Sequence, residues 1–360
     1  MKKTILPVSF FYGANRQSGY CSLYSELYNP FEKGNHIILK GGPGTGKSTL
    51  MKKIAKKLEL KGYYVERGYC SADPLSLDAV VAPEINFSIF DGTAPHVFDP
   101  TLPGISEHIV NLGVAWDNNY LNKYIGDISE LQKRNSSHHK KAASFLRVAS
   151  QIETEGALIC ARFTDEDKLD RYVSRLCARY IPENKGAGKG RVMKRFLSGV
   201  TPEGVTVQHD TVVALAERIF TIEDEYSAVS SYIMERLCSY ATDCGYDVYK
   251  CVCPLQPDFK TEHIIIPQLK LAFFTQNSYH FSINGQEQCI HASRFYDKPM
   301  YGEQKEKLKL YKKAKREFID EAVNNIAAAK RIHDSLEDYY VNATNFDVIN
   351  EISEKILNEV

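Results

Sequence analysis

The sequence predicts an α/β protein built from two similar halves, each a mainly parallel sheet flanked by helices, with helical extensions. Two observations lead to this prediction. A glycine-rich run lies between an apolar segment and a segment whose apolar residues recur at helical spacing. The same order of apolar and helical segments returns in the second half of the chain. Because 360 residues are enough for two domains, we predict one at 1–190 and one at 191–360.

The first predicted elements are a strand at 36–40 and a helix that follows the glycine-rich run. Ile37, Ile38 and Leu39 make the strand apolar. In the helix, apolar residues recur three and four positions apart, which is typical of a face packed on a sheet. That face consists of Leu50, Met51, Ile54, Ala55 and Leu58.

The run between strand and helix matches the phosphate-binding pattern GxxxxGK[ST]. Glycines let backbone N–H groups turn toward phosphate oxygens, and the N-terminus of the following helix adds partial positive charge. The pattern therefore predicts the phosphate-binding loop (P-loop) of a P-loop NTPase fold. Its residues are Gly41, Gly42, Pro43, Gly44, Thr45, Gly46, Lys47, Ser48 and Thr49.

This loop predicts two ligands, a nucleoside triphosphate and Mg²⁺. In the pattern, the amine of Lys47 reaches the β- and γ-phosphates and the hydroxyl of Ser48 ligates Mg²⁺. A carboxylate that completes the Mg²⁺ shell is expected after a buried strand. Residues 85–90 carry four Ile or Phe among six and lead to Asp91. We predict Asp91 as that carboxylate.

Two polar loops, at 70–78 and 91–100, follow predicted strands of the same sheet. Loops at the carboxyl ends of parallel strands gather at one edge of the sheet. Four side chains in them could orient water, accept a proton or bind a second ligand, although each is also a common turn former. They are Asp73, Asp78, His96 and Asp99.

An internal repeat relates the two halves. A shift of 183 residues places Met51 on Met234 and Cys70 on Cys253, and one inserted residue then places His96 on His280. Upstream, Phe10 falls on Phe196. Asp73 and Asp78 fall on Gln256 and Thr261, so both carboxylates are lost in the second half, which favours catalytic duty for them. His96 is kept, which favours a structural role.

The glycine-rich loop itself is lost in the second half. Residues 41–48 fall on 224–231, where no glycine remains and Ser230 replaces Lys47. Three acidic residues at 223–225 would repel a triphosphate at that helix N-terminus. We therefore predict one functional nucleotide site and one silent copy, in which Thr275 stands at the position of Asp91.

Helical segments follow each predicted sheet. Two amphipathic faces at 121–131 and 142–152 are separated by a polar, basic break at 133–141. Further helices are predicted at 165–179 and around 308–322. They could form a lid, a dimer interface or an outer layer. The basic break lacks aromatic residues, so we interpret it as a solvated loop rather than as a nucleic-acid surface.

Between the halves, residues 182–191 carry three glycines together with Lys185, Lys189 and Arg191. This loop is either a flexible linker or a lid that closes over the nucleotide and supplies a cation to the γ-phosphate.

Composition bounds the remaining possibilities. Lys and Arg together equal Asp and Glu together, at 45 each, so no overall charge favours nucleic acid. No run of 18 apolar residues predicts a membrane span, and the short apolar stretch at 4–11 does not resemble a signal peptide. We expect a cytoplasmic protein with reduced thiols. The cysteines at 238, 244, 251 and 253 form no CxxC pair, so packing is favoured over zinc.

With these motifs, the chain resembles a family of uncharacterised bacterial P-loop ATP-binding proteins, found mainly in Gram-positive bacteria, which carry two tandem P-loop halves. The resemblance covers nearly the whole chain. It implies the fold and ATP as the nucleotide, but no substrate, and family members can keep an intact second loop that this chain lacks. The matching segments are Lys40–Thr49, Cys70–Asp78, Asp91–Val97 and Thr201–Gly204.

Three functions remain open at this point. One is a Mg²⁺-dependent ATPase in which Asp73 or Asp78 acts near the attacking water. Another is a kinase for a small molecule or nucleotide, with residues 185–195 as a cationic lid. The third is a slow ATP-dependent switch whose helices bind a protein partner.

Overall fold

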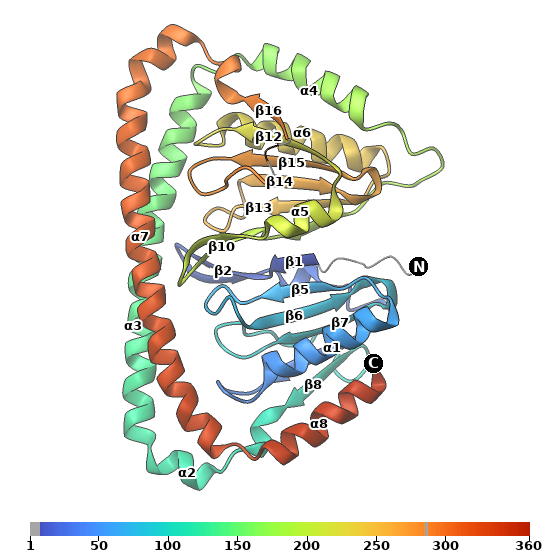
Figure 1. Cartoon of the computed structure of the whole chain (residues 1–360), viewed down its shortest axis with the longest axis vertical. Coiled ribbons are helices and arrows are strands. Elements are labelled where there is room, and N and C mark those ends of the chain that lie inside the picture. The colour runs from blue at the N-terminus through green and yellow to red at the C-terminus, as the bar shows by residue number, and fades with distance from the viewer. Residues whose placement is uncertain (1–7, 284, 286) are drawn as a thin grey trace. The chain divides into compact units, whose positions relative to one another are not determined.

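The computed structural model describes residues 8–283, 285 and 287–360, so the first part of the apolar stretch at 4–11 lies outside it. The protein is α/β, as predicted, and forms two compact units (Figure 1). Unit 1 comprises the chain through Ala143, Val200–Gly204 and Ala322–Val360. Unit 2 comprises Ser144–Gly199 and Val205–Glu321. These units do not follow the predicted division between residues 190 and 191.

Unit 1 contains a six-stranded sheet of order β1-β5-β6-β7-β4-β8. Three of its five neighbouring pairs are parallel, β1 with β5 and β4 with both β7 and β8. The sheet is mixed because β6 is antiparallel to β5 and β7. Only a short 3₁₀ turn joins β6 to β7, and a connection this short can join only antiparallel neighbours. The strands are β1 Val8–Phe11, β4 Asn35–Lys40, β5 Glu66–Tyr69, β6 Leu77–Ala82, β7 Phe87–Asp91 and β8 Glu107–Asn111.

The sheet of unit 2 repeats this topology. Its order is β16-β12-β15-β14-β13-β9, and each neighbouring pair runs in the same relative direction as its counterpart in unit 1. The register shift after Gly68 in β5 recurs after Cys251 in β13. The strands are β9 Val192–Arg195, β12 Arg218–Glu223, β13 Val248–Val252, β14 Thr261–Ile266, β15 Leu271–Gln276 and β16 Gln288–His291.

The strand registers correct one predicted match that bears on function. Gly68 pairs with Ala79 and its counterpart Cys251 pairs with His263. Asp78 therefore corresponds to Glu262, not to Thr261 as predicted, and the carboxylate is kept in the second half. The inserted residue lies in the loop before β14, where comparison of residue types alone cannot place it.

The strand registers also correct a second predicted correspondence between the two halves. Phe10 pairs with Gly68, and Arg195 pairs with Cys251. Phe10 therefore corresponds to Arg195 and not to Phe196. The remaining small elements also recur. In the first half they are the hairpin strands β2 Gly13–Arg16 and β3 Gly19–Ser22 and the 3₁₀ helix η1 Tyr24–Glu26. In the second half they are β10 Ser198–Thr201, β11 Gly204–Val207 and the helix α5 His209–Leu215.

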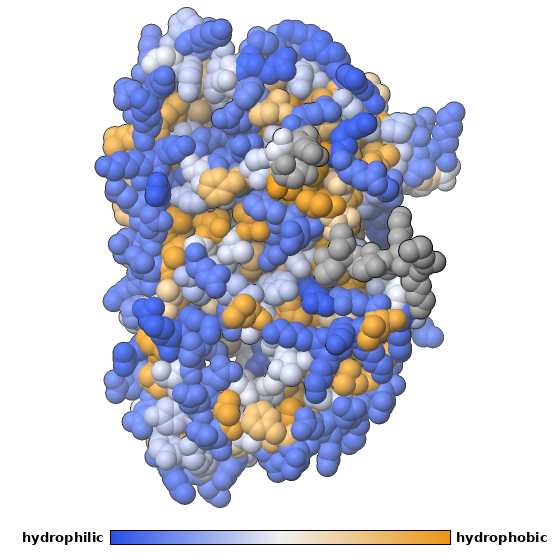
Figure 2. Space-filling view, in the orientation of Figure 1, coloured by the Kyte–Doolittle hydropathy of each residue, from blue (hydrophilic) through white to orange (hydrophobic). Residues whose placement is uncertain are grey.

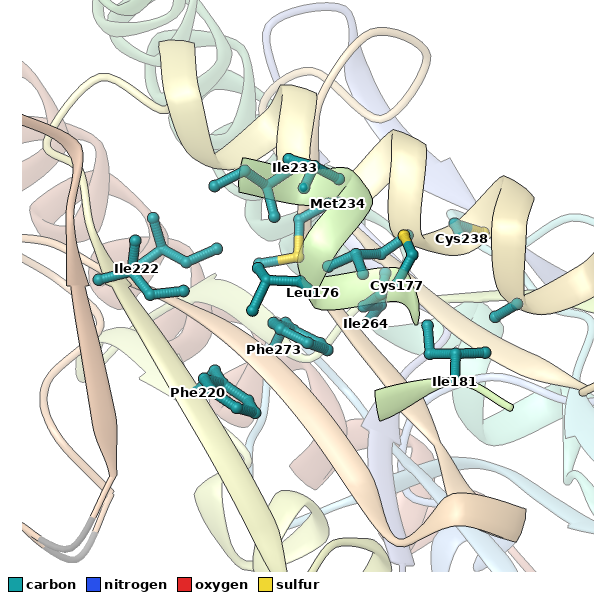
Figure 3. Packing of buried hydrophobic residues seen from close by; sticks show 14 of the residues in the cluster. Leu176, Cys177, Ile181, Phe220, Ile222, Ile233, Met234, Cys238, Ile264 and Phe273 are labelled. Atoms are coloured by element: carbon teal, nitrogen blue, oxygen red, sulfur yellow. The ribbon is translucent and has the colours of Figure 1, made fainter. Parts of the chain in front are cut away.

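Each half of the chain contributes its last helix to the sheet of the other half. Helix α8, Phe346–Glu359, packs through Ile356 against the sheet and the helix α1, Lys47–Lys61, in unit 1. Helix α4, Glu166–Tyr180, packs through Leu176 against the sheet and the helix α6, Ala228–Asp243, in unit 2 (Figure 3). This exchange is why the compact units are discontinuous in sequence.

The predicted buried face of α1 is confirmed, since all five of its apolar residues are buried. The helices predicted at 165–179 and around 308–322 are also present, as α4 and α7, Lys298–Ala343. The connection before α4 ends at Asp165, whose side chain accepts the N–H of Lys168 and caps the helix.

The predicted break at 133–141 is wrong, because α3 runs without interruption from Ile125 to Ala161, after the short helix α2 Asn118–Lys123. The stretch contains no Gly or Pro. Within unit 1, Asn135 donates to the carbonyl of Ala329 and His138 bonds Asn325. These polar side chains therefore contact α7.

Candidate functional site

The glycine-rich loop joins the interior strand β4 to the N-terminus of α1 in unit 1. Gly44 and Gly46 adopt left-handed backbone conformations, with φ of 68° and 81°. Such values are costly for residues with a Cβ atom. Gly46 is the N-cap of α1, so the loop turns directly into the helix. The local structure is thus strand, glycine loop and helix, as predicted.

Lys47 and Asp91 meet at this loop. The Nζ atom of Lys47 donates to the carbonyl oxygens of Gly41 and Gly42, at 2.5 and 2.7 Å. It also lies 3.5 Å from Oδ2 of Asp91. Asp91 is the last residue of β7 and pairs with Leu39 of the parallel strand β4, so both strands end at the same edge. The structure therefore brings together the two residues predicted to act on phosphate and magnesium.

Ser48 lies on the first turn of α1, beside the start of β6. Its Oγ accepts the N–H of Leu77 at 3.0 Å. Because β6 is antiparallel to β7, its first residues lie at the edge where Asp91 ends β7. Ser48 and Asp91 thus share one edge of the sheet, where a hydroxyl and a carboxylate can supply oxygen ligands to Mg²⁺.

Thr93 fixes the entrance of the loop, a role that the sequence analysis missed. The N–H of Gly41 donates to Oγ1 of Thr93 at 3.1 Å, and the hydroxyl lies 2.9 Å from the Gly41 carbonyl, where it donates back. The N–H of Thr93 in turn donates to Asp91. The presence of a threonine two residues after Asp91 is the feature of the sequence that could have indicated this role. Thr93 links the turn after Asp91 to Gly41, the first glycine of the loop.

The other face of the loop packs against α7 and Trp116, which the sequence analysis also missed. A Cβ atom added at Gly42 would lie 3.1 Å from Trp116 and 3.2 Å from Tyr340. One added at Gly44 would lie 2.6 Å from Val341. The rings of Trp116 and Tyr340 are 5.4 Å apart, edge to face. Since Tyr340 and Val341 are about 300 residues from the loop in sequence, no local pattern signalled this contact.

The four predicted polar side chains lie in different settings. Asp73 accepts the hydroxyl of Ser76 at 2.8 Å and lies 3.7 Å from Lys330 of α7. Asp99 is 81% exposed, near Lys40. Asp78 and His96 are both buried, with Oδ2 of Asp78 3.5 Å from Nε2 of His96. Asp78 and His96 therefore form a buried pair of polar side chains.

Cys70 completes this buried group. One donor atom each from Cys70, Asp78 and His96, the sulfur, a carboxylate oxygen and a ring nitrogen, all lie within 4.8 Å of one another. Burial raises the pKa of Asp78 above its usual value, against the opposing effect of His96. Burial likewise raises the pKa values of the Cys70 thiol and of the nearby Tyr20 hydroxyl.

In unit 2, a carboxylate occupies the helix N-terminus that corresponds to the loop. Oδ2 of Asp224 accepts the N–H groups of Val229 and Ser230 at 2.8 and 2.9 Å, on the first turn of α6. Ser227 keeps a left-handed backbone conformation, at the position of Gly44. These amides, which would face a phosphate in the pattern, are already bonded within the chain. That acidic residues would repel a triphosphate here stays a prediction.

The basic loop at 182–191 belongs to unit 2. Lys189 lies 2.9 Å from Asp243, and Arg191 lies 2.7 Å from Asp247. The N–H of Gly190 donates to the carbonyl of Thr242, at the C-terminal end of α6. The loop therefore lies at the opposite end of α6 from Asp224.

The four clustered cysteines of the second half do not share a set of metal ligands within the part of the chain that the structure describes. Cys238 packs in the apolar core of unit 2 (Figure 3). Over the same residues, no two cysteines form a disulfide.

Comparisons with known proteins give no identification: no protein-family model, curated protein or solved structure matches the chain. Among the described residues, no helix combines the length and apolar character needed to cross a bilayer. Figure 2 shows a face on which hydrophilic side chains predominate and hydrophobic ones are scattered.

Proposed function

We propose that this protein is a Mg²⁺-dependent ATPase with one functional nucleotide site, in unit 1, and one silent copy, in unit 2. The observation that carries the proposal is the 3.5 Å approach of Lys47 to Asp91 at a glycine loop between a strand and a helix. A lysine, a helix N-terminus and a carboxylate at one sheet edge are the groups that a magnesium–triphosphate complex requires.

The residues of the loop fit ATP and Mg²⁺ in the following roles. The loop amides and Lys47 hold the phosphates, and Lys47 exchanges its contacts with the carbonyls of Gly41 and Gly42 for phosphate oxygens. Ser48 and Asp91 supply ligands to Mg²⁺, which neutralises charge that develops on the phosphates. The resemblance of the motifs supports adenine, and the chain contains no Asn-Lys-x-Asp signature for guanine.

Of the two predicted residues near the attacking water, we retain Asp73. Asp78 is buried and engaged with Cys70 and His96. Asp73 is about 30% exposed and held by Ser76 and Lys330, so its position is defined while water can reach it. Hydrolysis takes place in the cytoplasm in this proposal.

A slow ATP-dependent switch is a second candidate, favoured by the packing of α7 on the loop. Tyr340 and Val341 contact the faces of Gly42 and Gly44, so a loop that adjusts to bound phosphate also displaces the end of α7. A helix that responds to nucleotide in this way can expose or hide a surface for a protein partner. The kinase hypothesis gains no comparable support, because Lys189 and Arg191 of its proposed lid pair with aspartates in unit 2.

The test is Mg²⁺-dependent phosphate release from ATP by the wild type and Lys47→Ala, with ATP binding measured in parallel. The matched control is Ser230→Ala, which changes the counterpart of Lys47 in the silent copy. Release that is lost in Lys47→Ala and kept in Ser230→Ala supports the ATPase. Tight binding with negligible release supports the switch. Formation of ADP together with phosphorylation of an added acceptor, without release of free phosphate, supports the kinase. Absence of ATP binding contradicts all three.

A further inference from the structure

Cys70, Asp78 and His96 come from three different segments and converge in the interior of unit 1. Cys70 follows β5, Asp78 lies on β6, and His96 lies in the loop after β7. Each is at least 93% buried. One donor atom from each side chain, a sulfur, a carboxylate oxygen and an imidazole nitrogen, lies within 4.8 Å of the other two. These three atoms are typical zinc ligands.

The geometry of Asp78 and His96 fits a shared cation. Zn–N and Zn–O bonds of about 2.0–2.2 Å place two tetrahedral ligands about 3.4 Å apart. Nε2 of His96 lies 3.5 Å from Oδ2 of Asp78. Despite this approach, Oδ2 of Asp78 has no hydrogen-bond partner among the described residues. An unpaired carboxylate oxygen in the interior is costly unless a positive charge faces it.

Tyr20 determines what His96 offers to Asp78. The Tyr20 hydroxyl bonds Nδ1 of His96. In the tautomer in which Nδ1–H donates to Tyr20, the lone pair of Nε2 faces the carboxylate oxygen of Asp78, 3.5 Å away, and both atoms can bind one metal ion. Fixing the imidazole through its other nitrogen is the usual arrangement around a metal-bound histidine.

The arrangement does not suit a Cys–His–Asp catalytic triad. In a triad, the imidazole bridges the nucleophile and the acid through its two different nitrogens. Here Nδ1 of His96 is occupied by Tyr20, so only Nε2 is left to face both Asp78 and Cys70. The three groups surround a common point instead of forming a chain.

Unit 2 keeps the same group but adds its own cation. Cys253, Glu262 and His280 stand at the corresponding positions, with Nε2 of His280 3.8 Å from Oε2 of Glu262. Nζ of Lys260 lies 3.4 Å from Oε1 of Glu262. In unit 1 the position of Lys260 is occupied by Ser76: the N–H of Cys253 donates to the carbonyl of Lys260, as that of Cys70 does to Ser76. Unit 1 therefore has a serine where unit 2 places a lysine beside the carboxylate.

We propose that Cys70, Asp78 and His96 bind a divalent transition-metal ion, with Zn²⁺ the best match, and leave its fourth position open. Thiolate and imidazole ligands favour Zn²⁺ over Mg²⁺, which prefers oxygen. On binding, the Cys70 thiol releases its proton to solvent as sulfur coordinates the metal. This site is distinct from the magnesium ligands Ser48 and Asp91, and the proposal does not depend on nucleotide binding.

The test titrates metal-free full-length protein with Co²⁺, a spectroscopic substitute for Zn²⁺, in the absence of nucleotide. We expect one tightly bound ion per chain, a near-ultraviolet thiolate-to-cobalt charge-transfer band, and displacement of the band by Zn²⁺. Cys70→Ser abolishes the band, whereas the matched variant Cys253→Ser, in the copy that contains Lys260, retains it. No band in the wild type overturns the proposal. A band that survives Cys70→Ser, or disappears in Cys253→Ser, also overturns it.

Substitution of Tyr20 tests the same site without removing a ligand. Loss of an outer partner of a metal-bound histidine lowers metal affinity about 10- to 100-fold, so Tyr20→Phe weakens Zn²⁺ binding by that factor and keeps the cobalt band. Thermal unfolding monitored by circular dichroism establishes that each variant is folded. An unchanged Zn²⁺ affinity in folded Tyr20→Phe contradicts the assigned role of His96.

Discussion

Nζ of Lys47 lies 3.5 Å from Oδ2 of Asp91, and both side chains are almost 90% buried. The contact joins the first turn of α1 to the end of strand β7, through two residues that are more than 40 positions apart in the chain. It defines the centre of the proposed nucleotide site, since phosphate and Mg²⁺ would be bound around these two charges.

Asp91→Asn tests the proposed magnesium ligand. The amide keeps the size of the side chain but removes its negative charge, so Mg²⁺ affinity and hydrolysis at limiting Mg²⁺ fall by at least ~10- to 100-fold, the loss seen even for outer-shell partners. Phosphate release measured against Mg²⁺ concentration checks this. The control is Asp99→Asn, which changes an exposed carboxylate of the following loop. Equal Mg²⁺ dependence in the two variants would exclude Asp91 from the magnesium shell.

Gly44→Ala tests the close packing of the loop on α7. The left-handed φ of 68° costs an alanine about 1–2 kcal/mol, and its Cβ atom would lie 2.6 Å from Val341. Gly104→Ala is the matched control, because its φ is 78° and nothing described lies within 4 Å of the added atom. We expect a larger loss of unfolding free energy and of ATP affinity in Gly44→Ala.

Urea unfolding and nucleotide titration measure these losses, and the addition of Val341→Ala to Gly44→Ala recovers the part due to the clash. If the two glycine variants lose equal stability, backbone strain alone explains the effect and α7 does not restrain the loop.

Asp224→Ala tests whether the carboxylate of the silent copy serves the fold. The variant removes the acceptor for the N–H groups of Val229 and Ser230 and costs about 0.5–2 kcal/mol of unfolding free energy, as for other helix caps. ATP turnover per folded molecule stays unchanged, because no lysine corresponds to Lys47 in this copy. A large change in turnover, with folding intact, would contradict the assignment of this copy as silent.

The buried group of Glu153, Lys260 and Lys315 in unit 2 predicts a pH dependence of stability. Glu153 lies 2.7 Å from Lys260 and 2.8 Å from Lys315. Burial by itself raises the pKa of Glu153, but the two ammonium groups outweigh it and lower the pKa to about 2. Since this value is below the usual 4.5, the stabilisation is complete above about pH 4.5 and disappears as the pH falls toward 2, by at most about 3 kcal/mol.

Urea unfolding of the wild type and of Glu153→Gln between pH 7 and pH 3 measures this contribution. The variant is less stable at neutral pH by about 3–5 kcal/mol, because it leaves buried ammonium groups with one fewer carboxylate. It also loses part of the decline in stability below pH 4.5. An identical decline in the two proteins would show that Glu153 does not titrate with the shifted pKa.

Local sequence patterns were sufficient to predict three features: the strand β4, the buried face of α1 and the position of Asp91 at the end of a strand. In each case a short apolar run, a 3.6-residue period or a glycine signature carries the information within about 20 residues. The long helix α7 was visible for the same reason. The break predicted in α3 was wrong because polarity at 133–141 was read as exposure, whereas Asn135 and His138 bond to α7.

By itself, the sequence determined the α/β class, the repeated halves and the phosphate-loop pattern, because these depend on spacing along the chain. Only the tertiary structure decided which helices cover which sheet, that Tyr340 and Val341 pack on the loop, and that Asp78 corresponds to Glu262. These features arise from contacts between residues up to 300 positions apart and from the register of strand pairs. The energy of such contacts depends on burial and complementary shape. The spacing of apolar residues along the sequence contains no information about either.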